Sequence, residues 1–256
     1  MGKKLTRTIL VLVGIIALGV IAYSGWYIFQ YWHGHQLGDL LKQRINGEPI
    51  VADINAASVD IPIDFESLQE VNPDIYAWVY IPGTDISYPV LQHTTDNGYY
   101  SNHAEDGSYF TGGSIYSENY NSKDFTDKMT VIYGHNLRSG SMFAKLNDFA
   151  DINVFDSHRY IYIYTPDKLF VYEIFAATPH THEHLLLNYD YNNRADYNSL
   201  FDSVMYKVKL NANYLDDVKL DFESDRILTL STCYRFDNQQ RFLVMGRLVS
   251  EIPARK

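Results

Sequence analysis

Three residue types in this chain fit nucleophilic catalysis by a thiol. Cys233, the only cysteine, ends the apolar run of the stretch TLSTC. The thiolate is the reactive form, and because a free thiol has a pKa of about 8.5, a neighbouring imidazole or guanidinium must favour it near neutral pH. His135 follows the apolar run VIYG, and Arg241 opens the apolar run RFLVMGRLV. These side chains are candidates for nucleophile, acid–base group and cationic partner.

The spacing of the cysteine and the arginine predicts how they meet. Arg241 lies eight residues after Cys233, so a strand ending at Cys233 can turn through RFDNQQ and return antiparallel beside it. His135 stands where Gly134 breaks an apolar strand, a placement that presents a polar side chain at a strand edge. Each residue alone also has a structural explanation: a buried thiol, a solvated loop histidine and a charge at the rim of a strand.

The N-terminus predicts where this chemistry takes place. An uncharged apolar run covers residues 9–29, long enough as a helix to span the roughly 30 Å core of a bilayer. Lys3, Lys4 and Arg7 precede the run, so residues 1–8 are expected in the cytoplasm and the rest of the chain outside the cell. A cleaved signal peptide is the alternative, although its apolar region is usually shorter. The prediction is a single-pass protein of the cell membrane.

Composition narrows the class of partner. The chain has 21 basic and 31 acidic residues and a formal charge of −10, which argues against nucleic acid because phosphate binding needs a basic surface. One cysteine excludes an internal disulfide. The stretch HTHEH places three histidines on one face of an extended segment, as zinc binding can require: His180, His182 and His184. We expect them to be solvated, with no metal and no cofactor.

Period-two apolar patterns predict about eight strands, enough for a closed barrel or a sandwich. Two pairs of strands flank turns, in YAWVYIPGTDISYPVLQ and in RYIYIYTPDKLFVYEIFAA. Single strands are expected in GGSIYS, MTVIYGHN, RILTLSTC and RFLVMGRLV. The fold class is therefore mostly β.

Helical patterns surround these strands. Residues 30–60 are expected to form an extracellular stalk, with apolar residues at helical spacing: Leu37, Leu40, Leu41 and Ile45. In the domain expected over 61–256, DFESLQEVNP predicts a short helix. DYNSLFDSVMYKVKL predicts one long helix before the cysteine strand, with an apolar stripe that packs on the barrel: Tyr197, Leu200, Phe201, Val204, Met205 and Val208.

The combination of TLSTC, the upstream YGHN and an arginine eight residues past the cysteine resembles the signature of the sortases, cell-wall transpeptidases of Gram-positive bacteria. The resemblance covers most of residues 64–250. The long helix before the cysteine strand and the helical segment before the first strand are similar to class B sortases in particular, as are GTDISYPVLQ and GGSIYS. The resemblance implies the sortase β-barrel of about eight strands, with N-terminal helices, behind a transmembrane helix.

The resemblance also implies a reaction. Cys233 would attack the threonine carbonyl of a C-terminal sorting motif in a surface protein and hold that protein as a thioester. An amine of a peptidoglycan precursor, or a pilin lysine, would then attack the thioester and become bonded to the protein. His135 would act as general acid and base, and Arg241 would stabilise the oxyanion. Two alternatives remain: a thiol hydrolase that uses water as acceptor, and an anchored wall-binding or metal-binding module with a structural cysteine.

Further positions match substrate-binding sites of the family: Ser231, Tyr100, Leu186, Leu187 and Asp96. Ser231 would face the same side of its strand as the cysteine, because side chains alternate along a strand. Core packing is an equally good explanation for the two leucines.

Two positions depart from the pattern of some members. Asp96 stands where some class B members carry Asn, which leaves the preferred motif open. Arg235 stands where some members carry an acid two residues after the cysteine, so no Cys-His-Asp triad can use that position. Asn136 or a backbone carbonyl would orient the imidazole instead. Arg235 also competes with Arg241 as the cationic partner, and the strand register favours Arg241.

Overall fold

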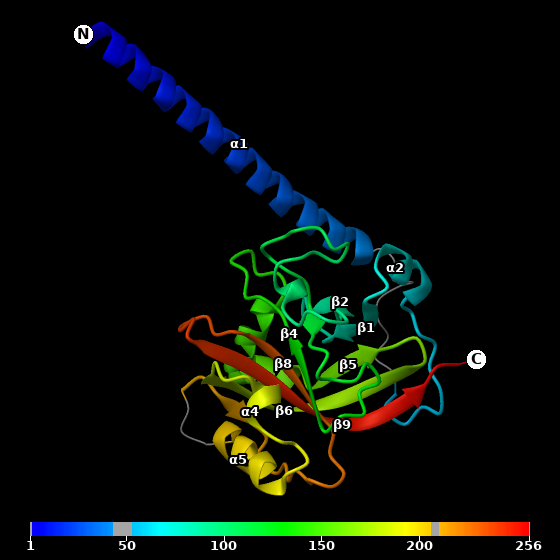
Figure 1. Ribbon diagram of the computed structural model, residues 1–256. Coiled ribbons are helices and arrows are strands. Elements are labelled where there is room, and N and C mark those ends of the chain that lie inside the picture. Colours follow the sequence, from blue (N-terminus) through cyan, green and yellow to red (C-terminus); the bar gives the residue numbers. More distant parts are fainter. Residues whose placement is uncertain (1, 43–52, 206–209, 256) are drawn as a thin grey trace.

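The computed structural model describes residues 2–42, 53–205 and 210–255. Figure 1 shows a barrel of strands with one long helix projecting from it. The strands are β1 (Ile75–Tyr80), β2 (Ser87–Leu91), β3 (Tyr116–Ser117), β4 (Met129–Tyr133), β5 (Tyr160–Tyr164), β6 (Lys168–Thr181), β7 (Asn213–Tyr214), β8 (Ile227–Cys233) and β9 (Gln240–Pro253). The helices are α1 (Gly2–Lys42), α2 (Phe65–Val71), α3 (Ile152–Ser157), α4 (Leu185–Asn188) and α5 (Arg194–Val204), with 3₁₀ turns at Tyr99–Ser101 and Phe143–Ala150.

Eight strands close into a barrel, which confirms the predicted fold. They follow the order β5-β1-β2-β3-β4-β8-β9-β6, and pairing between β5 and β6 closes the ring. The short strand β7 adds to β6 outside this ring, and no periodic pattern predicted it. Of the run GGSIYS, only Tyr116 and Ser117 are in a strand.

Alternation along β8 and β9 sorts their side chains between the two faces of the barrel wall. Leu228 and Leu230 of β8 point into the barrel core. Thr229, Ser231 and Cys233 therefore point to the outer face. Part of that face is covered by α5, through the predicted residues Tyr197, Leu200, Phe201 and Val204, all buried. Cys233 thus ends its strand on the outer face of the barrel.

Both helices predicted in the domain form, and the second has shifted ends. α2 matches the prediction, and Asp64 caps it by accepting a hydrogen bond from the Ser67 N–H. α5 begins at Arg194, earlier than predicted, because the Asn193 side chain caps its first turn. It ends at Val204, and the predicted Val208 lies outside the described residues.

The apolar N-terminal run lies within α1, a helix of 41 residues. Its apolar residues between 9 and 29 are exposed, and the helix is long and apolar enough to cross a membrane. The residues expected as the start of a stalk continue the same helix. Leu41 is 1% exposed in a cluster with residues of the barrel, and Ile45 lies outside the described residues. The end of α1 is therefore packed on the barrel.

Candidate active site

Cys233 and Arg241 meet across a hairpin, as their spacing predicted. β8 and β9 are antiparallel, and Cys233 pairs directly with Arg241. The Arg241 Nη1 donates to the Cys233 Sγ at 3.0 Å. A guanidinium this close can also donate to an oxygen that gains negative charge beside the sulfur during acyl transfer.

His135 reaches the same place from the other side of β8. β4 runs parallel to β8 with Tyr133 beside Ser231, and the Gly134 N–H donates to the Ser231 carbonyl at 3.1 Å. β4 itself ends at Tyr133, and two further residues in this register would bring His135 to the level of Cys233. A Cβ at position 134 would lie 2.4 Å from the Ile115 Cδ1 and 2.8 Å from the Phe143 ring, so a larger residue would have to displace these buried side chains. Three strand ends therefore converge on one point.

The imidazole is oriented by a backbone carbonyl. The His135 Nε2 lies 2.7 Å from the carbonyl oxygen of Ser101. A carbonyl only accepts, so Nε2 carries the proton in this hydrogen bond, and Nδ1 is the nitrogen left for chemistry. Of the two groups expected to orient the ring, the carbonyl does so, whereas the Asn136 side chain donates to the Cys233 carbonyl at 3.1 Å.

A second asparagine, for which no sequence pattern indicated a role, supports the cysteine. Asn147 is 2% exposed, and its amide donates to the Cys233 carbonyl at 3.2 Å. Its Oδ1 accepts from the Arg235 N–H at 2.8 Å. Asn147 thus holds the backbone on both sides of Tyr234 and fixes the end of β8.

Asn147→Ala is expected to lower the free energy of unfolding by about 1–3 kcal/mol, because the Arg235 N–H and one bond to the Cys233 carbonyl lose their partner. Denaturant unfolding would measure the loss. The matched control is Asn238→Ala, at an exposed asparagine in the turn between β8 and β9, for which we expect no comparable change. An equal effect of the two substitutions would contradict the role assigned to Asn147.

Arg235 points to a different partner. It donates through Nη2 to the Asp148 carboxylate at 2.6 Å and lies 3.5 Å from the Ala144 carbonyl. The contacts therefore favour Arg241 over Arg235 as the cation that acts on sulfur.

A half-buried group of polar side chains around Glu118, also not predicted, lies near Arg241. The Glu118 carboxylate is 3.0 Å from the His184 Nε2 and has a side chain only 13% exposed. Burial, with Glu118 nearby, raises the pKa of Tyr116 to about 12, although Arg241 opposes the shift. Burial and Glu118 also raise the pKa of Tyr133. The small cavity here, about 60 Å³, is lined by Tyr133, His184, Ser231 and Arg241 among others.

The predicted substrate-binding residues lie in different surroundings. Ser231, 4% exposed, lines the small cavity beside Arg241. Tyr100 is 2% exposed, and its hydroxyl donates to Asp74, while burial and that carboxylate raise its pKa. Leu186 is partly buried against the α5 cluster, whereas Leu187 is 58% exposed. Asp96 is exposed and accepts from the Gly98 N–H.

The three histidines of HTHEH have different partners. His180 is 4% exposed near Ser203 and Glu183, His182 is exposed, and His184 binds Glu118. β6 ends at Thr181, so the extended geometry expected for the segment does not continue. Among the described residues, no group of three metal-ligating side chains converges.

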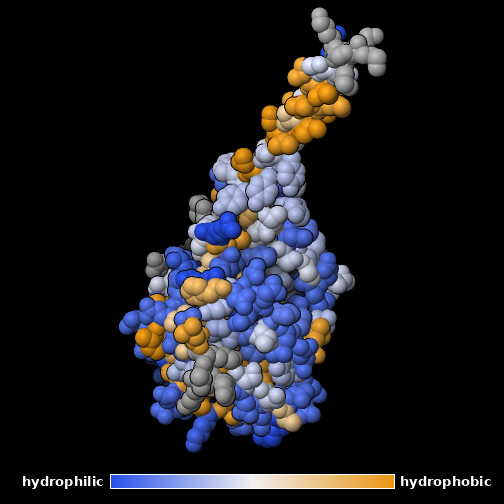
Figure 2. Space-filling view, turned by 90° about the vertical axis from the view of Figure 1, so that its left-hand side faces the viewer, coloured by the Kyte–Doolittle hydropathy of each residue, from blue (hydrophilic) through white to orange (hydrophobic). Residues whose placement is uncertain are grey.

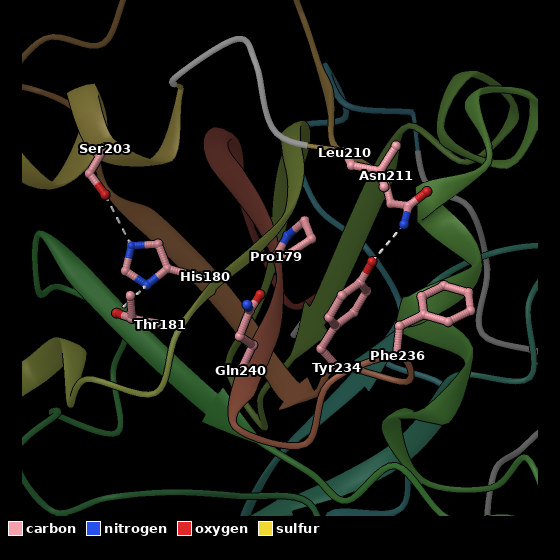
Figure 3. A pocket seen from close by; sticks show the side chains of 9 residues that line it. All are labelled: Pro179, His180, Thr181, Ser203, Leu210, Asn211, Tyr234, Phe236 and Gln240. Carbon is pink, nitrogen blue, oxygen red and sulfur yellow. Dashed lines mark hydrogen bonds between the residues drawn. The ribbon is translucent and has the colours of Figure 1, made fainter.

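A larger cavity of about 710 Å³ borders the hairpin turn (Figure 3). Tyr234 and Gln240 line it, and they adjoin Cys233 and Arg241 in sequence. Because side chains alternate along a strand, these two point to the opposite face from the thiol and guanidinium. Figure 3 shows the Asn211 amide on the Tyr234 hydroxyl at 2.7 Å on one side of the cavity, and His180 with Ser203 on the other.

Both sequence and fold match known sortases. Residues 79–249 match the sortase family, described as a sortase domain. The chain is 31% identical over 257 residues to Sortase B of Listeria monocytogenes, covering 98% of each. Sortase B of Bacillus anthracis has a TM-score of 0.70 at 26% identity, covering 87% of this chain and 99% of that one. Sortase B of Clostridium perfringens has a TM-score of 0.64 at 30% identity, with coverages of 73% and 100%. The chain therefore belongs to the sortase family of cysteine transpeptidases and, within it, to class B.

Proposed function

We propose that this sortase cleaves a C-terminal sorting motif after threonine and transfers the surface protein, through a thioester on Cys233, to an amine of the cell wall or of a pilin lysine. The observation that carries the proposal is the 3.0 Å contact between the Arg241 guanidinium and the Cys233 thiol. It joins a nucleophile to a cation on the face of the barrel where His135 also arrives.

The acylation step uses all three side chains. The Cys233 sulfur attacks the threonine carbonyl carbon, and the carbonyl oxygen gains a negative charge that Arg241 stabilises by hydrogen bonding. His135 holds the former thiol proton on Nδ1 while Cys233 attacks as the thiolate; it gives that proton to the leaving amide nitrogen, the C–N bond breaks, and the thioester remains.

Deacylation reverses these roles. An amine attacks the thioester carbon, His135 accepts a proton from that amine, and the C–S bond breaks to release Cys233 as thiolate. The Nε2 proton of His135 is hydrogen-bonded to the Ser101 carbonyl. Nδ1 is therefore the nitrogen that gives the proton in acylation and accepts it in deacylation.

Product analysis separates a transferase from a hydrolase. Peptides carrying class B-like motifs would be incubated with the protein, with and without an added amine, and the products weighed. We expect the amide of the added amine, with Cys233→Ala inactive. Release of the free acid alone at saturating amine would show a thiol hydrolase. Absence of any cleavage by a folded protein would favour the binding-module alternative.

We also propose that residues 9–29 cross the cell membrane with residues 1–8 in the cytoplasm. The single cysteine makes this testable, because Cys233 is half-buried and lies in the domain expected outside. A membrane-impermeant maleimide should label the protein in intact protoplasts, and Cys233→Ala should remain unlabelled. If labelling required lysis of the protoplasts, the catalytic domain would be in the cytoplasm and the proposed topology would be wrong.

The substrate-binding roles of Ser231, Tyr100, Leu186, Leu187 and Asp96 remain proposals. Leu187 allows the cleanest test because it is 58% exposed and contributes little to the core. Leu187→Ala is expected to raise KM several-fold at unchanged Tm, since each leucine CH₂ group that a bound peptide buries contributes about 0.8 kcal/mol. Unchanged KM values for all motif peptides would remove Leu187 from the binding surface. The exposed Leu210→Ala is the matched control.

A further inference from the structure

The C-terminal part of α1 packs against a loop of the catalytic domain, here called the docking loop (residues 102–112). The Trp26 ring stacks on the Tyr109 ring at 5.9 Å between centroids and 15° between planes. About two turns further along, the His33 Nε2 lies 3.0 Å from the Asp106 carboxylate. These contacts attach the helix to the domain at two heights.

Close packing continues along the helix. Gly34 lies so near Phe110 that a Cβ at this position would be 2.7 Å from the ring. Phe110 is 2% exposed and belongs to the barrel core, so the helix contacts the core itself. Leu41, 1% exposed, ends the contact. From Trp26 to Leu41 the joined stretch is about 22 Å long at 1.5 Å per residue.

The docking loop is held in place from within. The Phe110 N–H donates to the Asn102 carbonyl at 2.9 Å, and the Ala104 N–H donates to the Ser108 carbonyl at 2.8 Å. The Asn72 amide, near the end of α2, donates to the Glu105 carbonyl at 2.8 Å. A loop bonded at both its base and its tip transmits the position of the helix to the barrel.

The depth of Tyr109 follows from that of Trp26. Trp26 lies three residues before the end of the proposed span at Phe29, about 4.5 Å along the axis. Tryptophan and tyrosine favour the headgroup level of a bilayer. Tyr109 stacks on Trp26 and is 41% exposed, so it reaches the same level from the catalytic domain. Figure 2 shows the orange apolar part of the helix giving way to paler side chains where it enters the domain.

We propose that the docking loop rests in the headgroup layer of the outer leaflet, so that α1 and the barrel form one rigid unit seated on the membrane without a spacer. The proposal depends on the membrane span proposed above. Its consequence is a fixed orientation: α5, at the end of the barrel away from α1, faces away from the bilayer (Figure 1). The docking loop also follows directly after Ser101, whose carbonyl accepts a hydrogen bond from His135. The segment that contacts the membrane is therefore continuous with the residue that orients the imidazole.

The test measures depth in the full-length protein. In a Cys233→Ala background, single cysteines at positions 20, 109 and 120 would carry an environment-sensitive fluorophore, in vesicles of phosphatidylcholine and phosphatidylglycerol. Tyr120 is the matched control, an exposed tyrosine beside α4. We expect headgroup nitroxide lipids to quench the label at 109 several-fold more than at 120, and acyl-chain nitroxides to quench the label at 20.

Glycine substitutions test whether the packing causes the seating. Gly34→Leu must displace Phe110, whereas at Gly38 a Cβ meets nothing within 4 Å, and both changes raise helix propensity equally. In the Gly34→Leu protein, quenching of the label at 109 by headgroup nitroxides should fall to the level seen at 120. In the Gly38→Leu protein it should persist. Asp106→Asn, which removes the carboxylate that His33 contacts without filling space, should lower the quenching at 109 in part if Gly34→Leu does not fold.

The outcomes separate the two proposals. A label at 109 as weakly quenched as at 120, with position 20 buried in the acyl chains, would overturn the seating and leave the span intact. An unquenched label at position 20 would refute the span, and the seating with it. Quenching at 109 that Gly34→Leu and Asp106→Asn both leave unchanged would refute the rigid junction.

Discussion

Arg241→Ala is expected to lower kcat/KM for a sorting-motif peptide by about 10²–10³-fold, the usual loss when one donor to a developing oxyanion is removed. The physical reason is the position of the guanidinium, 3.0 Å from the attacking sulfur. Arg241→Lys should recover only part of the loss, because an ammonium on a flexible stem cannot reproduce the planar fork. Steady-state kinetics with a quenched-fluorescence peptide would measure both.

Arg235→Ala is the matched control for this prediction. Both arginines are exposed and lie in the same hairpin, but Arg235 binds Asp148 and not the thiol. Its kcat/KM should therefore stay within a few-fold of the original protein. A loss for Arg235→Ala as large as for Arg241→Ala, or an active Arg241→Ala protein, would show that the contact with sulfur does not stabilise the reaction.

His135→Gln is expected to reduce kcat about 10²–10⁴-fold, the usual contribution of a positioned general acid–base group. Glutamine can still donate to the Ser101 carbonyl, but it cannot exchange a proton with the leaving or attacking amine. The loss should appear mainly in kcat, and alkylation of Cys233 at neutral pH should slow as well.

His182→Gln controls for the loss of a histidine, because His182 is exposed on the loop after β6. It should retain the original kcat. If His135→Gln kept its kcat and alkylation rate, another group would have to move the proton and the three-residue account would fail.

The arginine–cysteine contact could be predicted because it is local. Eight residues separate the two side chains, and period-two alternation fixes their shared face, so a hairpin is the simplest solution. The approach of His135 is different, since it comes through parallel pairing of β4 with β8, almost a hundred residues apart. Spacing alone does not specify such a pairing, and the resemblance to sortases implied the role of His135 without it.

The residues that hold the site in place could not be predicted from the sequence for the same reason. Ser101, Asn147 and Glu118 act through contacts with distant segments, and none belongs to a periodic pattern. Tyr100 illustrates a further difficulty: its position matches a groove residue, but its hydroxyl lies in a buried network with Asp74 and Asn72. A sequence identifies a residue type at a position, whereas the fold decides which way the side chain faces.

The central claim is a thioester on Cys233, and intact mass spectrometry of the full-length protein tests it most directly. The protein would be mixed with a panel of peptides carrying class B-like and class A-like motifs, beside Cys233→Ala. The account predicts a mass gain equal to the N-terminal peptide fragment ending in threonine, absent in the control. No adduct with any peptide, together with a Cys233 that resists alkylation, would contradict it.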